Sequence, residues 1–132
     1  MDAKGMGRID RKGFTLIELL IVFIIVGLLA SIAIPIYRAN IKKVASSEGA
    51  ALLGTVLTAQ KTYYSENGTY TSDESLIGID TSGNKYFKDF DLVNADNNGF
   101  KARTTGTGLC EDVEVIMEYT NTAGATISYL GL

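Results

Sequence analysis

Apolar and polar positions divide this chain into an apolar run near its N-terminus and a longer segment of mixed character. No charged residue lies between Leu19 and Tyr37, and the run consists mainly of Leu, Ile, Val, Phe and Ala. At about 1.5 Å per residue, a helix of this length crosses the apolar core of a bilayer. The pattern predicts a single transmembrane helix, which we assign to residues 14–37.

Beyond this run, apolar or small residues recur at spacings near three and four, as one face of a helix requires. We therefore expect one long helix from Phe14 to about Glu66, with Asn67 and Gly68 as its C-terminal stop. Residues 67–84 are rich in Gly, Ser, Thr, Asn and Asp and predict a surface loop. The repeating positions are Ile41, Val44, Ala45, Ala51, Leu52, Val56, Ala59 and Tyr63.

The C-terminal third of the chain has the alternation typical of short strands. We expect strands at 86–92, 99–103, 113–119 and 126–130, with a turn at 121–124. They predict a small antiparallel sheet with one face on the long helix and the other in water. The expected fold is α+β, and residues 38–132 form its globular domain.

Composition narrows the functions that are open to this domain. The chain has 132 residues, no histidine and a net charge of −3, and without residues 1–13 the net charge would be −5. An acidic surface disfavours phosphate backbones, so no nucleic-acid partner is expected. Cys110 is the single cysteine and is expected to be a buried, inert thiol. Neither a phosphate-binding loop nor a triad pattern is present, so we expect no enzyme and no cofactor.

Glu18 is the unusual residue of the N-terminal region, because it lies four residues into an apolar stretch that begins at Phe14. A carboxylate within a membrane segment costs about 2–3 kcal/mol or more, so a cationic partner is expected. If the peptide bond before Phe14 were cut, the new α-amino group of a neighbouring subunit would be a cation at a suitable depth.

The charges that flank the apolar run bear on its orientation. Arg8, Arg11 and Lys12 precede it and favour a cytoplasmic N-terminus. Three basic residues follow the run and weaken this preference: Arg38, Lys42 and Lys43.

Two simpler interpretations of the apolar run stay open on these residues alone. A cleaved secretory signal would use a small residue pattern such as 30–33, although the apolar run continues beyond it. An uncleaved signal anchor would explain the length of the run. Neither interpretation accounts for Glu18.

The segment from Lys12 to Val22, KGFTLIELLIV, resembles the processing site of the superfamily of type IV pilins and type II secretion pseudopilins. The resemblance extends through the apolar helix to Pro35, and residues 63–70 resemble the segment that often ends the long helix in this family. It implies that residues 1–13 are a leader and that a prepilin peptidase cuts after Gly13 and methylates the amino group of Phe14. Glu18 then becomes the fifth mature residue and, with Phe14, an assembly residue.

The resemblance implies a structural subunit of a type IV pilus-like filament, polymerised through its N-terminal helix. The implied partners are further copies of the chain, the inner membrane before assembly, the peptidase, and the assembly platform with its ATPase. The subunit would be a single-pass inner-membrane protein before assembly and part of an extracytoplasmic filament afterwards. A secretion pseudopilin is the main alternative, and a membrane-tethered binding module is a further one.

Two helix-weakening residues lie within the apolar run. Pro35 removes a backbone donor and Gly27 lowers helix propensity, so a kink or a weak point is expected near them. The resemblance implies local melting there during filament packing, whereas a membrane helix also tolerates both residues.

Oxygen-bearing side chains recur before a glycine in the segment 94–99, as at the start of a calcium loop. Asn94, Asp96 and Asn98 are the weak calcium candidates, but Thr105 stands where a closing glutamate would be needed. A solvated turn between two strands is the preferred interpretation, and no metal site is expected.

Overall fold

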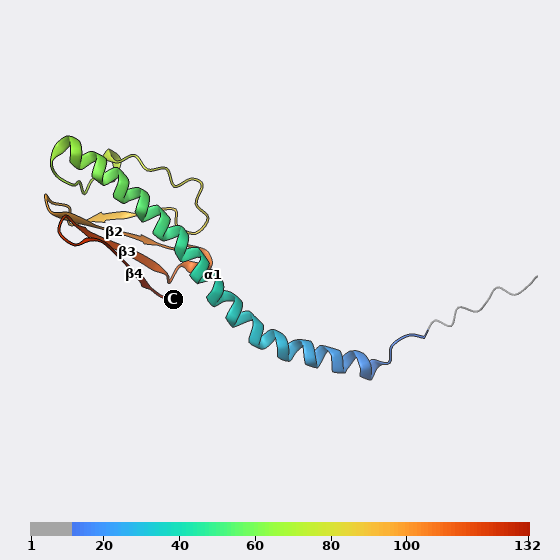
Figure 1. Cartoon of the computed structure of the whole chain (residues 1–132). Helices are drawn as coiled ribbons and strands as arrows, with labels where there is room; N and C mark the ends of the chain where they lie inside the picture. Colours follow the sequence, from blue (N-terminus) through green and yellow to red (C-terminus); the bar gives the residue numbers. More distant parts are fainter. Residues whose placement is uncertain (1–11) are drawn as a thin grey trace, which may run out of the picture. The chain divides into compact units, whose positions relative to one another are not determined.

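The computed structural model describes residues 12–132, so most of the expected leader lies outside the described residues. These residues form two compact units, one that ends at Pro35 and one from Ile36 to Leu132. Figure 1 follows the chain through its elements in order. They are α1 (Leu16–Asn67), a 3-10 turn η1 (Glu74–Leu76), β1 (Asp91–Val93), β2 (Gly99–Thr105), a second 3-10 turn η2 (Gly108–Cys110), β3 (Glu114–Thr120) and β4 (Gly124–Leu130).

The first unit consists of the N-terminal part of α1. Its large apolar side chains are exposed, from Leu19 at 45% to Leu16 at 87%. By length and composition, α1 contains the one helical segment among residues 12–132 that is suited to cross a membrane. Such a surface is unfavourable in water and needs lipid or other helices around it.

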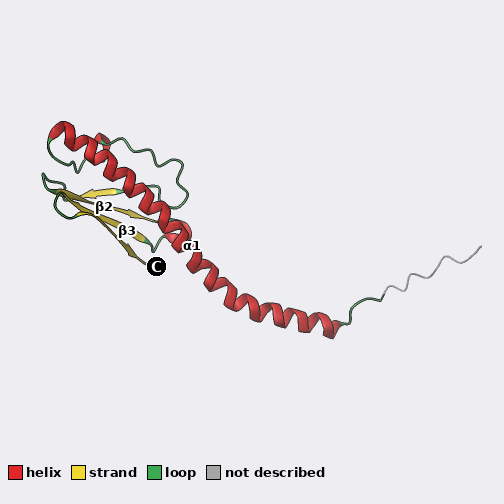
Figure 2. Cartoon of the chain, in the orientation of Figure 1, coloured by secondary structure: helices red, strands yellow, loops and turns green. Residues whose placement is uncertain are grey.

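The second unit packs the C-terminal part of α1 against one face of a four-stranded sheet (Figure 2). The sheet is an antiparallel meander of order β1-β2-β3-β4. In β3, Val115 and Met117 are buried and face the helix, as their spacing of two requires. This arrangement confirms the expected α+β fold.

The helix and the sheet approach each other closely at Gly49. A Cβ atom at this position would lie 2.9 Å from Val115 Cγ2 and 3.0 Å from Phe87 Cδ1. The neighbouring core side chains Leu53 and Val56 are fully buried. Gly49 therefore allows the sheet and the loop before β1 to reach the helix backbone.

The ends of the regular elements agree with local sequence signals in most places. The helix ends at Asn67, and Gly68 adopts a φ of 72° while its N–H donates to Tyr64 O at 2.7 Å. This left-handed glycine cap confirms the expected stop. The expected strand 113–119 is present one residue later, and the other two C-terminal strands are longer than expected.

The expected strand 86–92 is wrong over most of its length, because only Asp91–Val93 pairs with the sheet. The preceding backbone is bonded mainly by side chains. Glu48 Oε1 accepts the N–H groups of Tyr86 and Phe87 at 2.8 and 2.9 Å, and Asn84 Nδ2 donates to Phe87 O. These bonds satisfy the backbone without a neighbouring strand.

The sheet face toward the helix is only partly covered, which refines the expectation of one buried face. Every residue of β4 after Gly124 is exposed. Ile127 and Tyr129 pair with the buried Met117 and Val115 and so lie on the helix side, yet they remain 37% and 43% exposed. The helix thus covers β2 and β3 but leaves the edge strand β4 exposed.

Candidate functional site

The N-terminus of α1 is closed by a reciprocal pair of hydrogen bonds. The N–H of Thr15 donates to Glu18 Oε2 at 2.7 Å, and the N–H of Glu18 donates to Thr15 Oγ1 at 3.2 Å. Thr15 is the N-cap and Glu18 the third helical residue, so the two form a capping box. Sequence reasoning missed this role for Glu18, although the pattern Thr-x-x-Glu was there to be read.

The expected cleavage junction lies just outside this cap. Gly13 and Phe14 precede the helix, and the Phe14 side chain is 83% exposed. A Cβ atom at Gly13 would meet no atom within 4 Å. Because the fold does not require glycine here, a requirement for Gly13 would come from a processing enzyme.

Glu18 is the only charged side chain of α1 before Arg38. It is exposed, and around it lie apolar side chains that are exposed as well. Chemically, this segment can pack against apolar surfaces and can offer one carboxylate to a cation. If the chain is cut after Gly13, the new amino group of Phe14 on another copy would be such a cation, and both the cut and the pairing stay predictions.

Helix α1 is continuous through both helix-weakening residues. Pro35 lies inside the helix, and a Cβ atom at Gly27 would have open space around it. Gly27 is therefore not needed to accommodate a contact of the described chain. Their part in kinking or melting stays a prediction.

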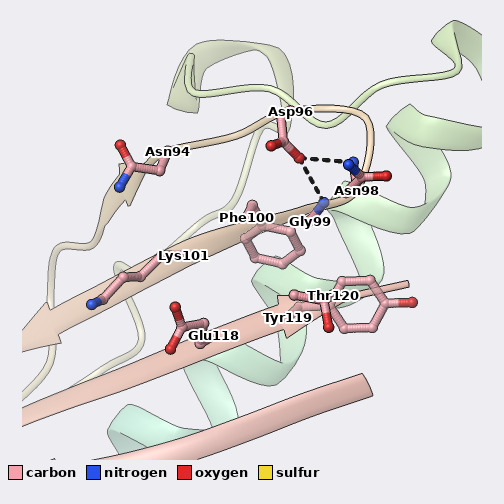
Figure 3. Close-up of a pocket in the computed structure, with 9 residues that line it drawn as sticks. All are labelled: Asn94, Asp96, Asn98, Gly99, Phe100, Lys101, Glu118, Tyr119 and Thr120. Atoms are coloured by element: carbon pink, nitrogen blue, oxygen red, sulfur yellow. Dashed lines mark hydrogen bonds between the residues drawn. The ribbon is translucent and has the colours of Figure 1, made fainter. Parts of the chain in front are cut away.

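The calcium candidates lie in the β1–β2 turn, at a shallow hollow of about 200 Å³ (Figure 3). Asp96 Oδ1 accepts the N–H groups of Asn98 and Gly99 at 2.7 and 2.9 Å. Its carboxylate therefore closes the turn. Within residues 12–132 no three Asp, Glu, His or Cys side chains gather as metal ligands.

Cys110, the last residue of η2, is fully buried. Burial raises the pKa of its thiol, and the nearby carboxylates of Asp112 and Glu48 raise it further against the opposing effect of Lys42. A thiol with a raised pKa is mostly protonated at neutral pH. The burial of Cys110 confirms the expected buried position, and its inertness stays a prediction.

Several polar contacts that hold the second unit together were not expected from sequence. The buried Gln60 donates to Thr71 O at 2.6 Å and accepts from Thr71 N–H at 3.0 Å, which ties the loop to α1. Lys42 forms an ion pair with Asp112, 70 residues later. No local pattern announces such pairs, because their partners are distant in sequence.

Aromatic residues gather where α1 ends. Tyr70 stacks on Tyr64 with ring centroids 4.6 Å apart and contacts Phe100 at 5.3 Å and Tyr119 at 5.7 Å. Burial and the neighbouring Tyr119 raise the pKa of Tyr70 to about 12. The cluster joins the loop to the helix and the sheet, so packing accounts for it.

Two family models together match most of the chain. The model described as "Prokaryotic N-terminal methylation motif" matches residues 8–34. The model described as "Type IV minor pilin ComP, DNA uptake sequence receptor" matches residues 35–112. The first match contains Gly13, Phe14 and Glu18, and the second covers more than half of the chain.

Curated relatives carry pilus names. The chain is 38% identical over 106 residues to the fimbrial protein EcpC of Eikenella corrodens, a match that covers 79% of this chain and 69% of the relative. It is 36% identical over 92 residues to the type IV wide pilus major component PilA4 of Thermus thermophilus, covering 69% and 70%. It is 37% identical over 87 residues to the type IV major pilin PilE of Neisseria gonorrhoeae, covering 64% and 52%, so the chain spans about half of that longer protein.

Proposed function

Because this chain belongs to the type IV pilins, the structural subunits of pili, we propose that it is cleaved after Gly13 and polymerises through α1 into an extracytoplasmic filament. In this proposal residues 1–13 are the leader, residues 14–37 the membrane and filament-core segment, and residues 38–132 the exported domain. Its relatives are fimbrial and pilin proteins, which supports a structural role over an enzymatic one. The same names favour a pilus over a secretion pseudopilus.

The observation that carries the proposal is the exposed apolar surface of α1 with one carboxylate near its start. Before assembly, lipid covers this surface, while Glu18 lies near the cytoplasmic edge where water and headgroups solvate it. In the filament, neighbouring helices replace the lipid. An unpaired Glu18 would then be costly, whereas pairing with the amino group of Phe14 on a neighbour removes that cost and sets the axial register.

The capping box gives the test of this role its control variants. Glu18→Gln removes the charge and keeps an oxygen that can accept the Thr15 N–H, whereas Glu18→Ala removes both. Thr15→Ala removes the other half of the box and keeps the carboxylate. If charge pairing drives assembly, both Glu18 variants fail to polymerise and Thr15→Ala succeeds.

The experiment measures filaments in the shear fraction and subunits in the membrane fraction of cells that express each variant. We expect both Glu18 variants to accumulate in the membrane as processed chains, because the apolar run and Gly13 are intact. If Glu18→Gln yields as many filaments as the unsubstituted chain, the capping hydrogen bond is sufficient for assembly and the charge of Glu18 is not needed. The same yield from Glu18→Ala would show that apolar packing alone assembles the filament.

Reception of DNA is a second candidate function, and the observation that favours it is the family match over residues 35–112. The charge of the chain opposes it: residues 14–132 carry 8 basic and 13 acidic side chains. A DNA site would need a local basic cluster, and its affinity would fall steeply with salt. Fluorescence anisotropy of a labelled DNA duplex, with the full chain in detergent at two salt concentrations, tests whether the chain binds DNA. We expect no saturable binding, and salt-sensitive saturation would establish the receptor.

A further inference from the structure

One edge of the sheet has no partner strand. Among the described residues β4 pairs with β3 alone, and each of its residues from Ala125 to Leu130 is exposed. Figure 1 shows β4 as the outermost strand of the sheet. In an edge strand, every second residue points its N–H and C=O groups away from the sheet. β4 therefore offers free backbone donors and acceptors along its seven residues.

The two edges of the sheet differ in how they are protected. Proteins commonly protect an edge against further pairing with a short strand, charged side chains or proline. The β1 edge is three residues long and is accompanied by charged residues: Lys88, Asp89 and Asp91. The β4 edge has none of these devices, and no charged side chain occurs from Tyr119 to Leu132. A further strand can therefore pair with β4 and not readily with β1.

The absence of charge at β4 bears on the kind of partner that fits it. The chain has a net charge of −3, so two copies repel each other on average, but β4 contributes nothing to this repulsion. The charges on the outer face of the sheet lie over the other strands, where Arg103 bridges Asp91 at 3.0 Å and Glu114 at 3.9 Å. A charged ligand would find no counter-charge on β4, whereas an uncharged strand meets no electrostatic obstacle.

The sequence of β4 is complementary to itself. In an antiparallel pair of two β4 strands with Ile127 opposite Ile127, all seven residues are matched. The first two of the other pairs set a small residue against a large one, and the third sets two hydroxyl side chains together. These pairs are Ala125 with Tyr129, Gly124 with Leu130, and Thr126 with Ser128.

This register continues the apolar face of the sheet from one copy into the other. Met117 on β3 pairs with Ile127 within each copy, so a row of Met117, Ile127, Ile127 and Met117 would cross the contact. In the neighbouring rows, Val115 pairs with Tyr129, and Tyr129 would lie beside Ala125 of the second copy. Ile127 and Tyr129, which are 37% and 43% exposed, would thereby gain apolar neighbours.

The outer face brings no acidic pair together in this register. Glu118 pairs with Thr126 within a copy, and its row would continue with Ser128 and Ile116 of the second copy. The two Glu118 side chains would be about 16 Å apart, from the spacing of strands and of residues along them. This separation exceeds the Debye length of about 8 Å at physiological salt.

We propose that two copies of this chain pair through their β4 edges, antiparallel and with Ile127 at the two-fold axis. The pairing joins the two sheets into one and uses residues of the second unit alone. A filament built by one repeated rotation and translation contains no such two-fold contact, so the pairing joins copies in different filaments. Each subunit of a filament would repeat the edge, and many weak contacts would add up. The joining of filaments rests on the proposed function, whereas the pairing of single copies does not.

Disulfide formation between lipid nanodiscs, each with one full chain, tests the pairing without polymerisation. Discs with Thr126→Cys are mixed with discs with Ser128→Cys and oxidised. We expect a linked dimer from the mixture, because these positions lie opposite each other. Each variant alone should give little dimer, because identical positions are then offset by about 7 Å along the strands, too far for a relaxed disulfide. Lys88→Cys is the control at the other edge, and the unsubstituted chain checks that the buried Cys110 forms no link.

Three results would count against the proposal. Equal yields from the mixture and from either variant alone would overturn the register. A yield no higher than that of Lys88→Cys would show random collision and overturn the pairing. No dimer from any edge variant would also overturn the pairing, would leave the proposed filament untouched, and would assign the β4 edge to a strand of a different protein.

Charged residues at the two matched positions give an independent arm. Thr126→Lys with Ser128→Lys puts like charges opposite each other in two rows of a homotypic pair, and so does Thr126→Glu with Ser128→Glu. Each such row should lower the association constant by up to about fivefold, measured by sedimentation of the discs. A mixture of the lysine and glutamate variants should regain the pairing, and its failure to do so would contradict the contact. Lysine or glutamate at the exposed Thr58 and Thr62 of α1 is the matched control for net charge.

Electron microscopy of sheared filaments tests the consequence for filaments. We expect side-by-side contacts between filaments of the unsubstituted chain and separate filaments of the lysine variant. Contacts that persist in the lysine variant would overturn the joining of filaments by β4. If the unsubstituted chain forms no filaments, the proposed function fails, and the disulfide result still decides whether single copies pair.

Discussion

Glu48 and Phe87 are 39 residues apart in sequence, yet Glu48 Oε1 accepts the Phe87 N–H at 2.9 Å. The same oxygen accepts the Tyr86 N–H at 2.8 Å. One carboxylate on α1 thus takes the place of a sheet partner for the loop before β1. Phe87 is fully buried beneath this bond, so the contact sets the position of a core side chain as well.

Replacing Glu48 by alanine should lower the free energy of unfolding of the second unit by about 2 kcal/mol, because two backbone N–H groups lose a charged acceptor. Urea unfolding of the full chain in detergent, followed by tyrosine fluorescence, measures the change. Glu66→Ala is the matched control, since Glu66 is exposed near the end of α1. Equal stability of the two variants would contradict the role of Glu48.

The same carboxylate predicts a dependence of stability on acid. Burial raises the pKa of Glu48, but the N–H groups of Phe87 and Tyr86 and the charge of Lys85 lower it more, to a net value below 4.5. Because the folded-state pKa lies below that of the unfolded chain, the stabilisation is complete above about pH 4.5 and is lost as pH falls through the folded value.

In Glu48→Gln the melting temperature should therefore fall less steeply below pH 4.5 than in the unsubstituted chain. Melting curves across pH 2–6 measure this. Asp112 has a lowered pKa for a different reason, its hydrogen bond with Lys42, and it is exposed. Asp112→Asn should flatten the profile less. Parallel profiles for Glu48→Gln and the unsubstituted chain would refute the linkage.

Two glycines of α1 should respond oppositely to alanine. Gly49→Ala places a methyl group 2.9 Å from Val115 Cγ2, so overpacking should cost about 1–3 kcal/mol. Gly54 has open space at its Cβ position, so Gly54→Ala should stabilise the unit by up to about 1 kcal/mol through helix propensity. Thermal melting of both variants measures the difference, and a shift of the same sign in both would contradict the close contact at Gly49.

Residues 38–132 should fold without metal. Asp96 already accepts two backbone N–H groups, so calcium would have to displace them. Free calcium at 100 times the dissociation constant of a site would add about 2.7 kcal/mol to the free energy of unfolding. We expect no corresponding rise in melting temperature when calcium replaces a chelator. Asp96→Ala should nevertheless cost about 1 kcal/mol, because the turn loses its acceptor. A large calcium-dependent stabilisation would establish the site.

Leader removal should occur after Gly13 in the native host. Intact mass and N-terminal sequencing should find a chain that begins at methylated Phe14. Gly13→Leu should trap the full-length precursor without altering the fold, because a side chain at this position meets no atom within 4 Å. A mature chain that begins near Ala33 would support secretory cleavage instead.

Local patterns were sufficient for the elements that depend on neighbouring residues. The charge-free run, the glycine stop at Gly68 and the alternation of Val115 and Met117 each predict their element, because helix caps and strand faces are determined within a few residues. The helical and processing pattern around Glu18 likewise indicated the family. Its capping bond to Thr15 was readable in the same four residues.

Contacts between distant residues were beyond those patterns. The sequence by itself determined a membrane-length apolar helix, a processing motif and a strand-rich C-terminal domain, because each is written in short-range periodicity. Only the tertiary structure decided that Glu48 replaces a strand partner for residues 86 and 87, that Gly49 lies against Val115, and that β4 stays uncovered. These features depend on which surfaces meet after the chain folds, and a sequence pattern of period two or 3.6 carries no information about the partner.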